Sequence, residues 1–349
     1  SLQVVHASNV GKKSEMTLQE QDILYMQRCI QLARCGREGA APNPMVGAVI
    51  VCQGHIIGEG YHIRCGGPHA EVNAIRSVRD PEQLKQSTIY VSLEPCAHYG
   101  KTPPCADLIV EKQIPRVVVG CQDPFAKVNG LGIKKLRDAG IEVRVGVLEE
   151  ECIRLNRRFM NFHRHHRPWV TLKWAQSADG YMDKERTPNQ SPACFSSPFT
   201  QVLVHRMRAQ NMAIMVGTNT VLYDNPSLTN RLWPGNSPLR VTIDRHGRIP
   251  STAHLLDESV PTVVYHDESL QEILGHLYQR GIQSLMVEGG ARLLESFLQE
   301  GLWDEARVEE SPCQLCQGVP APSVGQMHLV DRQRVDGRWI SWYEKCHGI

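Results

Sequence analysis

The sequence predicts an α/β protein of two domains, and three observations lead to this prediction. The chain has 349 residues, about twice the length of a typical domain. Hydrophobic residues make up 41% of it and charged residues 21%, which is ordinary for a folded protein with two cores. Short apolar runs alternate with stretches of helical spacing in both halves, as expected where helices cover sheets.

The first half begins with a helix. Thr17 and Glu20 form a capping-box pattern, and the helix that they open extends to about Ala33. Residues 45–52 form an apolar strand, and Gln53-Gly54 suits a hairpin turn into a strand over residues 55–61. Helices are then predicted at 69–78, 105–112 and 130–139, with strands at 88–93, 116–121 and 142–147. Buried strands between helices imply a three-layer α/β sandwich over residues 17–148.

A charged stretch at residues 149–167 marks the boundary and predicts a linker helix. Its basic residues suit a solvated helix face, and a site for an anionic partner is the alternative. A second α/β unit follows over residues 168–345. Its strands are predicted at 169–175, 213–216, 239–243, 262–265 and 284–287, and its helices around 199–207, 270–278 and 291–298.

Charge and cysteine usage restrict the possible surroundings of the chain. The formal net charge is +1, which predicts neither a nucleic-acid nor a membrane partner. No apolar run reaches membrane-spanning length, and residues 1–16 lack the layout of a signal peptide. The twelve cysteines are scattered, so we expect free thiols and a few metal ligands in a reducing cytoplasm. A homodimer is expected on symmetry statistics alone.

The strongest motif is Pro68-His69-Ala70-Glu71, followed by Glu94-Pro95-Cys96 and then by Cys105. One imidazole and two thiolates suit zinc and leave a fourth position for water, as in catalytic sites. Prolines before His69 and Cys105 predict that both residues lie in the first turns of helices. The partial positive charge at a helix start favours a thiolate at Cys105.

Glu71 is two residues from a ligand and is not predicted to be one. Hydrolytic loss of an exocyclic amine needs a group that carries protons from water to the leaving nitrogen, and Glu71 suits that role. The order of His-x-Glu, Pro-Cys and a third ligand follows the signature of zinc deaminases, except that eight residues instead of two separate Cys96 from Cys105. Three buried residues or a structural zinc site form the alternative interpretation.

The segment at residues 97–104, together with Asn43-Pro44-Met45-Val46-Gly47, resembles the bifunctional deaminase/reductase family of riboflavin biosynthesis. That family deaminates a 2,5-diamino-pyrimidinone ribosyl phosphate and then reduces the ribose of the product to a ribityl chain with NADPH. The resemblance implies a cytidine-deaminase-like first domain. It also implies that Asn43, His98 and Lys101 lie near the pyrimidine or its phosphate.

The second half resembles the reductase part of this family. The motifs that carry the resemblance are Lys173 to Gly180, Arg208, Val216 to Val221, Asp224 to Thr229, Arg231 and Glu288-Gly289-Gly290. They imply a dihydrofolate-reductase-like fold that binds NADPH. The glycines precede a predicted helix, whose N-terminus suits a cofactor phosphate.

The resemblance also implies individual roles in the second half. The expected cofactor contacts are Ala175, Thr220, Asp224, Gly289 and Gly290. The expected contacts of the ribosyl phosphate are Ser196, Arg208, Leu228, Arg231 and Glu288, in which the arginines suit phosphate. Lys173 and Asp224 are the polar groups expected to take part in the hydride step.

Two segments depart from the family pattern. Pro192-Ala193-Cys194 stands where a tryptophan is expected before Ser196, and the residues from Ser311 to Cys316 replace a more glycine-rich stretch. Because of both departures, an active deaminase joined to a degenerate reductase stays an alternative. Two further alternatives are a nucleoside or nucleic-acid deaminase, and a non-catalytic zinc-stabilised interaction protein.

Overall fold

The computed structural model describes residues 16–99, 103–125 and 129–345, which fall into two compact units. The first unit consists of residues up to Gly36 and of Met45–Leu155. The second unit consists of Arg37–Pro44 and of the residues from Asn156 onward. Residues 1–15 and Lys101 lie outside the described residues. The first of these segments is most of the stretch that was predicted to lack the layout of a signal peptide.

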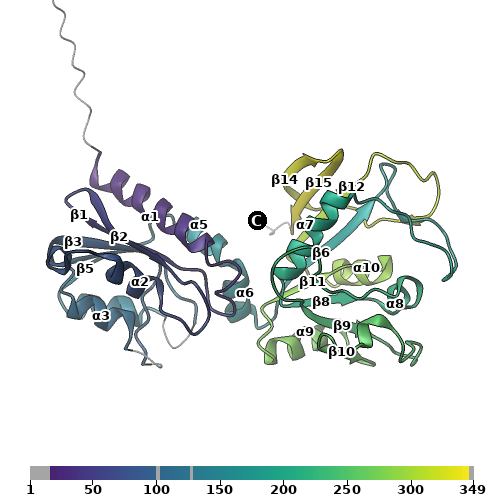
Figure 1. Cartoon of the computed structure of the whole chain (residues 1–349), viewed down its shortest axis with the longest axis horizontal. Helices are drawn as coiled ribbons and strands as arrows, with labels where there is room; N and C mark the ends of the chain where they lie inside the picture. The colour runs from purple at the N-terminus through teal and green to yellow at the C-terminus, as the bar shows by residue number, and fades with distance from the viewer. Residues whose placement is uncertain (1–15, 100–102, 126–128, 346–349) are drawn as a thin grey trace, which may run out of the picture. The chain divides into compact units, whose positions relative to one another are not determined.

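The first unit contains a five-stranded sheet in the order β2-β1-β3-β4-β5 (Figure 1). The strands are β1 (Gly47–Cys52), β2 (His55–Tyr61), β3 (Ser87–Leu93), β4 (Arg116–Cys121) and β5 (Glu142–Val145). β1 pairs antiparallel with β2 and β3, whereas β3, β4 and β5 are parallel. Almost every residue of β3 and β4 is buried, because helices cover both faces of these two strands.

Helices cover this sheet on both sides. α1 (Leu18–Arg34) and α5 (Glu149–Leu155) lie on one face, and α2 (Ala70–Ser77), α3 (Cys105–Glu111) and α4 (Leu131–Asp138) lie on the other. A short 3-10 helix, η1 (Pro81–Gln86), precedes β3. The predicted capping box is present at the start of α1. The three-layer sandwich predicted from the sequence is therefore confirmed.

A buried carboxylate fastens α1 to the sheet. Asp22 accepts two hydrogen bonds from Arg116, both at 2.9 Å, one from Arg144 at 2.6 Å and one from the Tyr90 hydroxyl at 2.9 Å. Although burial raises the pKa of Asp22, the hydrogen bonds from Arg116 and Tyr90 outweigh it and lower the pKa. A carboxylate that has this many donors can remain charged in the interior.

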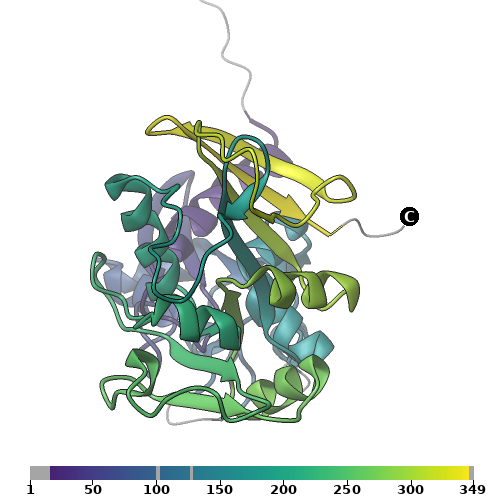
Figure 2. The same cartoon turned by 90° about the vertical axis from the view of Figure 1, so that its right-hand side faces the viewer.

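The second unit contains an eight-stranded sheet in the order β10-β9-β8-β11-β6-β12-β15-β14. Its strands are β6 (Trp169–Gln176), β8 (Ala213–Val216), β9 (Leu239–Ile243), β10 (Thr262–Tyr265), β11 (Ser284–Val287), β12 (Glu305–Glu310), β14 (His328–Val335) and β15 (Arg338–Glu344). The first six strands in this order are parallel, and β15 and β14 add an antiparallel edge, which is yellow in Figure 2. Two short strands, β7 (Tyr181–Asp183) and β13 (Val319–Pro320), form a separate pair.

The second unit also has helices on both faces of its sheet. α9 (Leu270–Gln279) and α10 (Ala291–Gln299) contribute Leu274 and Phe297 to a core with Leu172 and Val287. α7 (Pro198–Ala209) covers the other face, where Met207 packs near Ile214 and Met286. α8 (Thr218–Asp224), the short helix η2 (His254–Leu256) and the strands after residue 304 were not among the predicted elements.

The boundary region differs from the single linker helix that the sequence predicted. The structure has two helices, α5 and α6 (Arg157–His165), separated at Asn156. α5 belongs to the first unit and α6 to the second. Three arginines of the basic stretch are paired within the second unit: Arg157 with Glu305, Arg158 with the Gln210 carbonyl and Arg167 with Asp304. These three arginines therefore bind partners within the protein and do not form the solvated helix face that the sequence suggested.

No helix among the described residues is both long and apolar enough to cross a membrane.

Candidate active site

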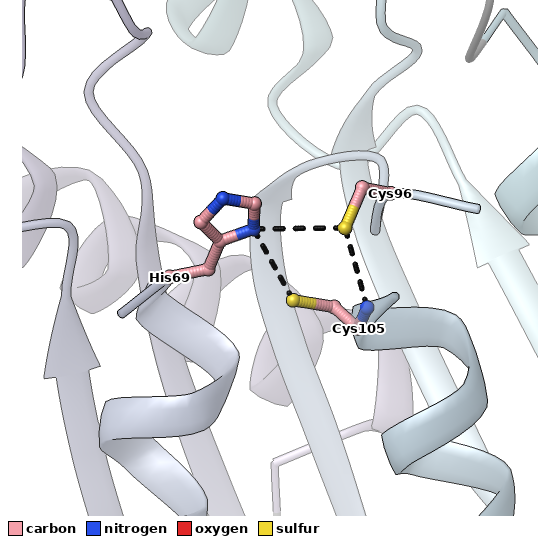
Figure 3. A group of neighbouring side chains, drawn as sticks. All are labelled: His69, Cys96 and Cys105. Carbon is pink, nitrogen blue, oxygen red and sulfur yellow. Dashed lines mark hydrogen bonds between the residues drawn. The ribbon is translucent and has the colours of Figure 1, made fainter. Parts of the chain in front are cut away.

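Three elements of the first unit bring His69, Cys96 and Cys105 together (Figure 3). Cys96 follows the end of β3, and Cys105 is the first residue of α3. His69 was predicted in a first helical turn, but it is the N-cap of α2, with extended backbone angles of φ −70° and ψ 164°. The helix begins at Ala70 because the extended backbone of His69 lies outside the helical region.

The ligand atoms of these three residues lie within 4.8 Å of one another. His69 Nδ1 is 3.6 Å from Cys96 Sγ and 3.3 Å from Cys105 Sγ, and the Cys105 N–H donates to Cys96 Sγ at 3.2 Å. These separations match the edges of a metal tetrahedron with one imidazole and two thiolates. The donor set therefore fits zinc. His69 is exposed, Cys96 is partly buried and Cys105 is buried, so the cluster lies at the edge of the domain core.

Glu71 lies in the first turn of α2, and its side chain is buried. Burial raises the pKa of Glu71 to about 7. A carboxyl group with a pKa near neutrality can both accept and release a proton at physiological pH. Glu71 is not a member of the candidate ligand set, which agrees with the role predicted from its position.

Glu94 is a second buried carboxylate beside the cluster, and the sequence did not reveal its role. Its Oε2 accepts the N–H groups of Asp123 at 3.2 Å and Gly130 at 2.9 Å. Its Oε1 accepts those of Gly132 at 2.9 Å and Ile133 at 3.2 Å. Glu94 thus ties the start of α4 to the segment that carries Cys96.

The glycine at position 132 makes this arrangement possible. A Cβ atom at Gly132 would lie 1.9 Å from the Pro95 carbonyl oxygen, so a larger residue would push α4 away from Glu94. Asp123, at the carboxyl end of β4, was also missed: burial raises its pKa to about 6, and its Oδ1 accepts the Phe125 N–H at 2.8 Å. Its position at a strand end is the signal that could have identified it.

Three further residues were predicted for the first site. His98 is exposed on the segment after Cys96. Asn43 lies in Arg37–Pro44, which belongs to the second unit, and its N–H donates to the Ala40 carbonyl at 2.8 Å. Lys101 lies outside the described residues. The roles of these three residues remain predictions.

The second unit contains a cavity of about 410 Å³ beside β6 and α7. Seven of the residues predicted for the reductase line it: Lys173, Ala175, Ser196, Arg208, Asp224, Arg231 and Glu288. Lys173 and Ala175 belong to β6, and Arg208 belongs to the last turn of α7. Residues predicted from separate motifs therefore meet in one cavity, which is large enough for part of a nucleotide or sugar phosphate.

Opposite charges pair in the wall of this cavity. Arg208 donates to Glu288 from Nε at 3.2 Å and from Nη2 at 2.8 Å. Burial raises the pKa of Glu288, but Arg208 and Lys173 outweigh this effect and lower it to about 2. Burial also lowers the pKa of Lys173, while Glu288 opposes that shift. Glu288 is thus a carboxylate across the physiological pH range.

Asp224 is paired with a residue that the sequence did not reveal. Arg186 forms an ion pair with Asp224 through Nη2 and donates to Asp183 Oδ2 from Nε at 2.6 Å. The Arg186 side chain is only 4% exposed. Arg186 therefore fixes the position of the Asp224 carboxylate at the cavity wall.

The remaining predicted residues lie outside the cavity lining. The Leu228 side chain is buried in a core cluster with Met207 and Ile214. Gly289 and Gly290 precede α10 with positive φ angles, and a Cβ atom on Gly290 would lie 3.4 Å from Thr220 Oγ1. Thr220 and the glycine pair are therefore neighbours, as a joint cofactor contact requires.

Further lining residues were missed by the sequence interpretation. Gln201, Val204 and His205 lie on the same side of α7 as Arg208, and the helical spacing from Arg208 could have identified them. His205 Nδ1 accepts the Arg231 N–H at 2.9 Å. Pro192, Ala193 and Cys194 also line the cavity, so the first departure from the family pattern lies in its wall. Cys313 and Cys316 of the second departure are exposed and are not among the lining residues.

Comparison with known families covers both units. Residues 19–121 match the cytidine and deoxycytidylate deaminase zinc-binding region, and residues 168–332 match the RibD C-terminal domain. The riboflavin biosynthesis protein RibD of Aquifex aeolicus is 40% identical over 341 residues, which cover 91% of this chain and 94% of that protein. The RibD protein of Escherichia coli is 36% identical over 327 residues, which cover 84% of this chain and 88% of that protein.

Solved structures agree with the sequence comparison. The Thermotoga maritima diaminohydroxyphosphoribosylaminopyrimidine deaminase/5-amino-6-(5-phosphoribosylamino)uracil reductase is 35% identical, with a TM-score of 0.85 over 94% of this chain and 99% of that chain. Acinetobacter baumannii RibD is 34% identical, with a TM-score of 0.85 over 94% of this chain and 100% of that chain.

These comparisons confirm the resemblance, the fold class and the enzyme class predicted from the sequence. They decide against the non-catalytic interaction protein, since the family consists of enzymes. Zinc and NADPH agree with the zinc-binding deaminase region and the RibD reductase domain. The chain belongs to the RibD family of riboflavin biosynthesis, as a bifunctional enzyme that joins a deaminase to a reductase.

Proposed function

We propose that the chain deaminates 2,5-diamino-6-ribosylamino-4(3H)-pyrimidinone 5′-phosphate and then reduces the ribosyl group of the product to a ribityl chain with NADPH. The observation that carries the proposal is the cluster of His69, Cys96 and Cys105 beside the buried Glu71. The name of the Thermotoga maritima relative describes the same pair of activities.

In the deaminase, His69, Cys96 and Cys105 would hold zinc, which supplies Lewis acidity for the attack of water on the ring. Glu71 takes a proton from the attacking water and delivers it to the exocyclic nitrogen, which leaves as ammonia. The buried position of Glu71 keeps bulk water from competing for that proton. We propose that Asn43, His98 and Lys101 contact the pyrimidine or its phosphate.

In the reductase, we assign the ribosyl phosphate to Ser196, Arg208, Leu228, Arg231 and Glu288. The two arginines supply the planar donors that phosphate oxygens accept, and both line the cavity. Leu228 can contribute only through its backbone, because its side chain is buried in the core. Glu288 fixes the Arg208 guanidinium and accepts a hydrogen bond from a hydroxyl group of the sugar.

We assign NADPH to Ala175, Thr220, Asp224, Gly289 and Gly290. The positive φ angles and missing side chains of the two glycines leave the start of α10 open to a phosphate. NADPH supplies the hydride that reduces C1′ of the sugar. Lys173 and Asp224 line the same cavity and orient the sugar for that step.

We further propose that the deaminase domain spans residues 17–148, that residues 149–167 connect the domains and that the reductase domain spans residues 168–345. The proposed enzyme is a cytoplasmic homodimer that acts on a small molecule and has neither a nucleic-acid nor a membrane partner. Support comes from the net charge of +1 and from the cysteines of the described residues, which are free thiols.

The test is the ratio of NADPH oxidised to ammonia released with the diamino-pyrimidinone ribosyl phosphate as substrate. The proposal requires a ratio near one. Ammonia release without NADPH oxidation would contradict the reductase and point to the wall formed by Pro192, Ala193 and Cys194. Absence of both products would contradict the substrate assignment.

A further inference from the structure

A buried ion pair lies on β12, next to the strand that carries Lys173. β12 runs parallel to β6, with Arg307 level with Lys173 and Glu309 level with Ala175. Residues two apart on a strand share a face, so Arg307 and Glu309 lie on the face of the sheet that carries Lys173 and Ala175. Arg307 is 2% exposed and Glu309 is fully buried. Neither residue lines the cavity.

Glu309 connects this pair to another part of the cavity wall. Its Oε1 accepts the Thr200 hydroxyl at 2.6 Å, and its Oε2 accepts from Arg307 Nη1 at 3.3 Å. Thr200 closes the capping box of α7 with Ser197, whose N–H donates to Thr200 Oγ1 at 2.8 Å. Ser196, the adjacent residue, lines the cavity. A buried chain of contacts therefore runs from Arg307 to the residue before the start of α7.

Charges of both signs surround Lys173. Arg208 and Arg307 are cations and Glu288 and Glu309 are carboxylates, and all four act on the pKa of the Lys173 amine beside the larger effect of burial. Arg307 Nη2 is buried and has no hydrogen-bond partner among the described residues. A buried arginine with an unused donor is costly for stability, so packing alone gives no account of it.

We propose that Arg307 and Glu309 are positioning residues of the reductase. They fix the positions of the Lys173 ammonium and of Ser196 in the cavity wall, and they touch neither NADPH nor the sugar phosphate. The proposal rests on the proposed reduction in this cavity. Like charges on adjacent strands repel, so Arg307 directs the Lys173 ammonium toward Glu288. Glu309 holds Thr200, and Thr200 holds the start of α7.

The electrostatics of Lys173 provide a readout that a purely structural role would not produce. Beyond the effect of burial, Arg307 lowers the pKa of Lys173, whereas Glu309 raises it. Arg307→Met should therefore raise the pKa of the Lys173 amine, and Glu309→Gln should lower it. The titration is followed by NMR of the lysine side chain in the protein without NADPH, with Lys173→Arg to assign the signal.

Kinetics supply the second readout. We expect the double variant Arg307→Met/Glu309→Gln, which removes both charges, to remain folded, because neither charge is left unpaired. Its reductase kcat should fall about tenfold, the scale of a small misplacement of reacting groups, while ammonia release stays at the wild-type rate. Arg332 and Glu310 form a matched control, since this exposed pair also involves β12 and lies 3.7 Å apart. Arg332→Met/Glu310→Gln should change neither readout.

The outcomes separate this inference from the proposed function. Unchanged Lys173 titration in both single variants, or a shift of the same sign in both, overturns the positioning role. Wild-type reductase kinetics in the folded double variant overturns it as well. If a single variant does not fold, the reductase kinetics of the double variant decide the question, because that variant leaves neither charge unpaired. A wild-type enzyme that oxidises no NADPH, but whose Lys173 responds with opposite signs, refutes the proposed function and leaves the electrostatic coupling intact.

Discussion

Arg208 holds the Glu288 carboxylate through two hydrogen bonds, from Nε to Oε1 at 3.2 Å and from Nη2 to Oε2 at 2.8 Å. A third donor of Arg208, Nη1, reaches the Thr229 carbonyl at 2.9 Å. The Arg208 and Glu288 side chains are 13% and 7% exposed. An arginine fixed by two partners presents its remaining donor edge to the cavity in one orientation, which favours recognition of a phosphate.

The pair predicts a pH dependence of stability. Burial opposes ionisation of Glu288, yet Arg208 and Lys173 lower its pKa from 4.5 to about 2. Because the folded-state value is the lower one, the stabilisation is fully present above about pH 4.5 and is lost as the pH falls toward 2. We expect Glu288→Gln to lower the free energy of unfolding by up to about 3 kcal/mol at pH 7, and the difference from wild type to shrink below pH 4.5. Urea unfolding at several pH values measures it, and a difference that stays constant down to pH 3 would contradict the assignment.

Glu71→Gln should abolish ammonia release and leave the metal bound. The amide has nearly the same shape as the carboxyl group but cannot carry a proton, so a loss of roughly 10²- to 10⁴-fold in deaminase kcat is expected. Reduction of substrate that has already been deaminated should proceed at the wild-type rate. Ammonia release and NADPH oxidation are measured separately for this purpose. Loss of both activities in the variant would argue against two independent sites.

Metal removal gives a third prediction. Purified protein should contain about one zinc ion per chain, since three ligands lie together in the described residues. Cys105→Ser should lower the zinc content and the deaminase rate together, because a serine hydroxyl replaces the thiolate at the buried ligand position. Cys35→Ser is the matched control, since Cys35 is an exposed free thiol outside the ligand set. Elemental analysis and ammonia assays check both variants, and metal-free protein with full activity would refute the site.

The deaminase site could be predicted closely from the sequence because its chemistry is local. The motif residues lie close to prolines or to a strand end: His69, Glu71, Cys96 and Cys105. The effect of a proline or a strand end on the backbone can be predicted from a short segment alone. Glu94 escaped prediction because its four N–H donors come from residues that lie 29 to 39 positions further along the chain. A contact of that separation has no local pattern.

The reductase site was harder to predict from the sequence for the same reason. Lys173, Arg208 and Glu288 come from three distant motifs, and only the family resemblance joined them before the structure placed them around one cavity. No local pattern marks Arg307 and Glu309 as buried, since alternating charged and apolar residues on a strand usually indicate one solvated face. They are buried because β15 continues the sheet beyond β12 and because α7 covers their face. The sequence predicted the helix around residues 199–207 but neither the strands β12 and β15 nor the face of the sheet that this helix covers.

Glu94→Gln tests whether the buried carboxylate supports the metal cluster. The amide keeps one oxygen that can accept, but its NH₂ group would face two of the N–H donors that now bond to a carboxylate oxygen. We expect a loss of roughly 2–5 kcal/mol in the unfolding free energy, because two buried donors lose their acceptor. The start of α4 should loosen from the Cys96 segment, so zinc should dissociate faster into a chelator. Glu111→Gln is the control, because Glu111 is an exposed residue at the end of α3 and its change should cost less than about 0.5 kcal/mol. Equal stability and equal zinc release in the two variants would show that Glu94 neither anchors α4 nor supports the metal site.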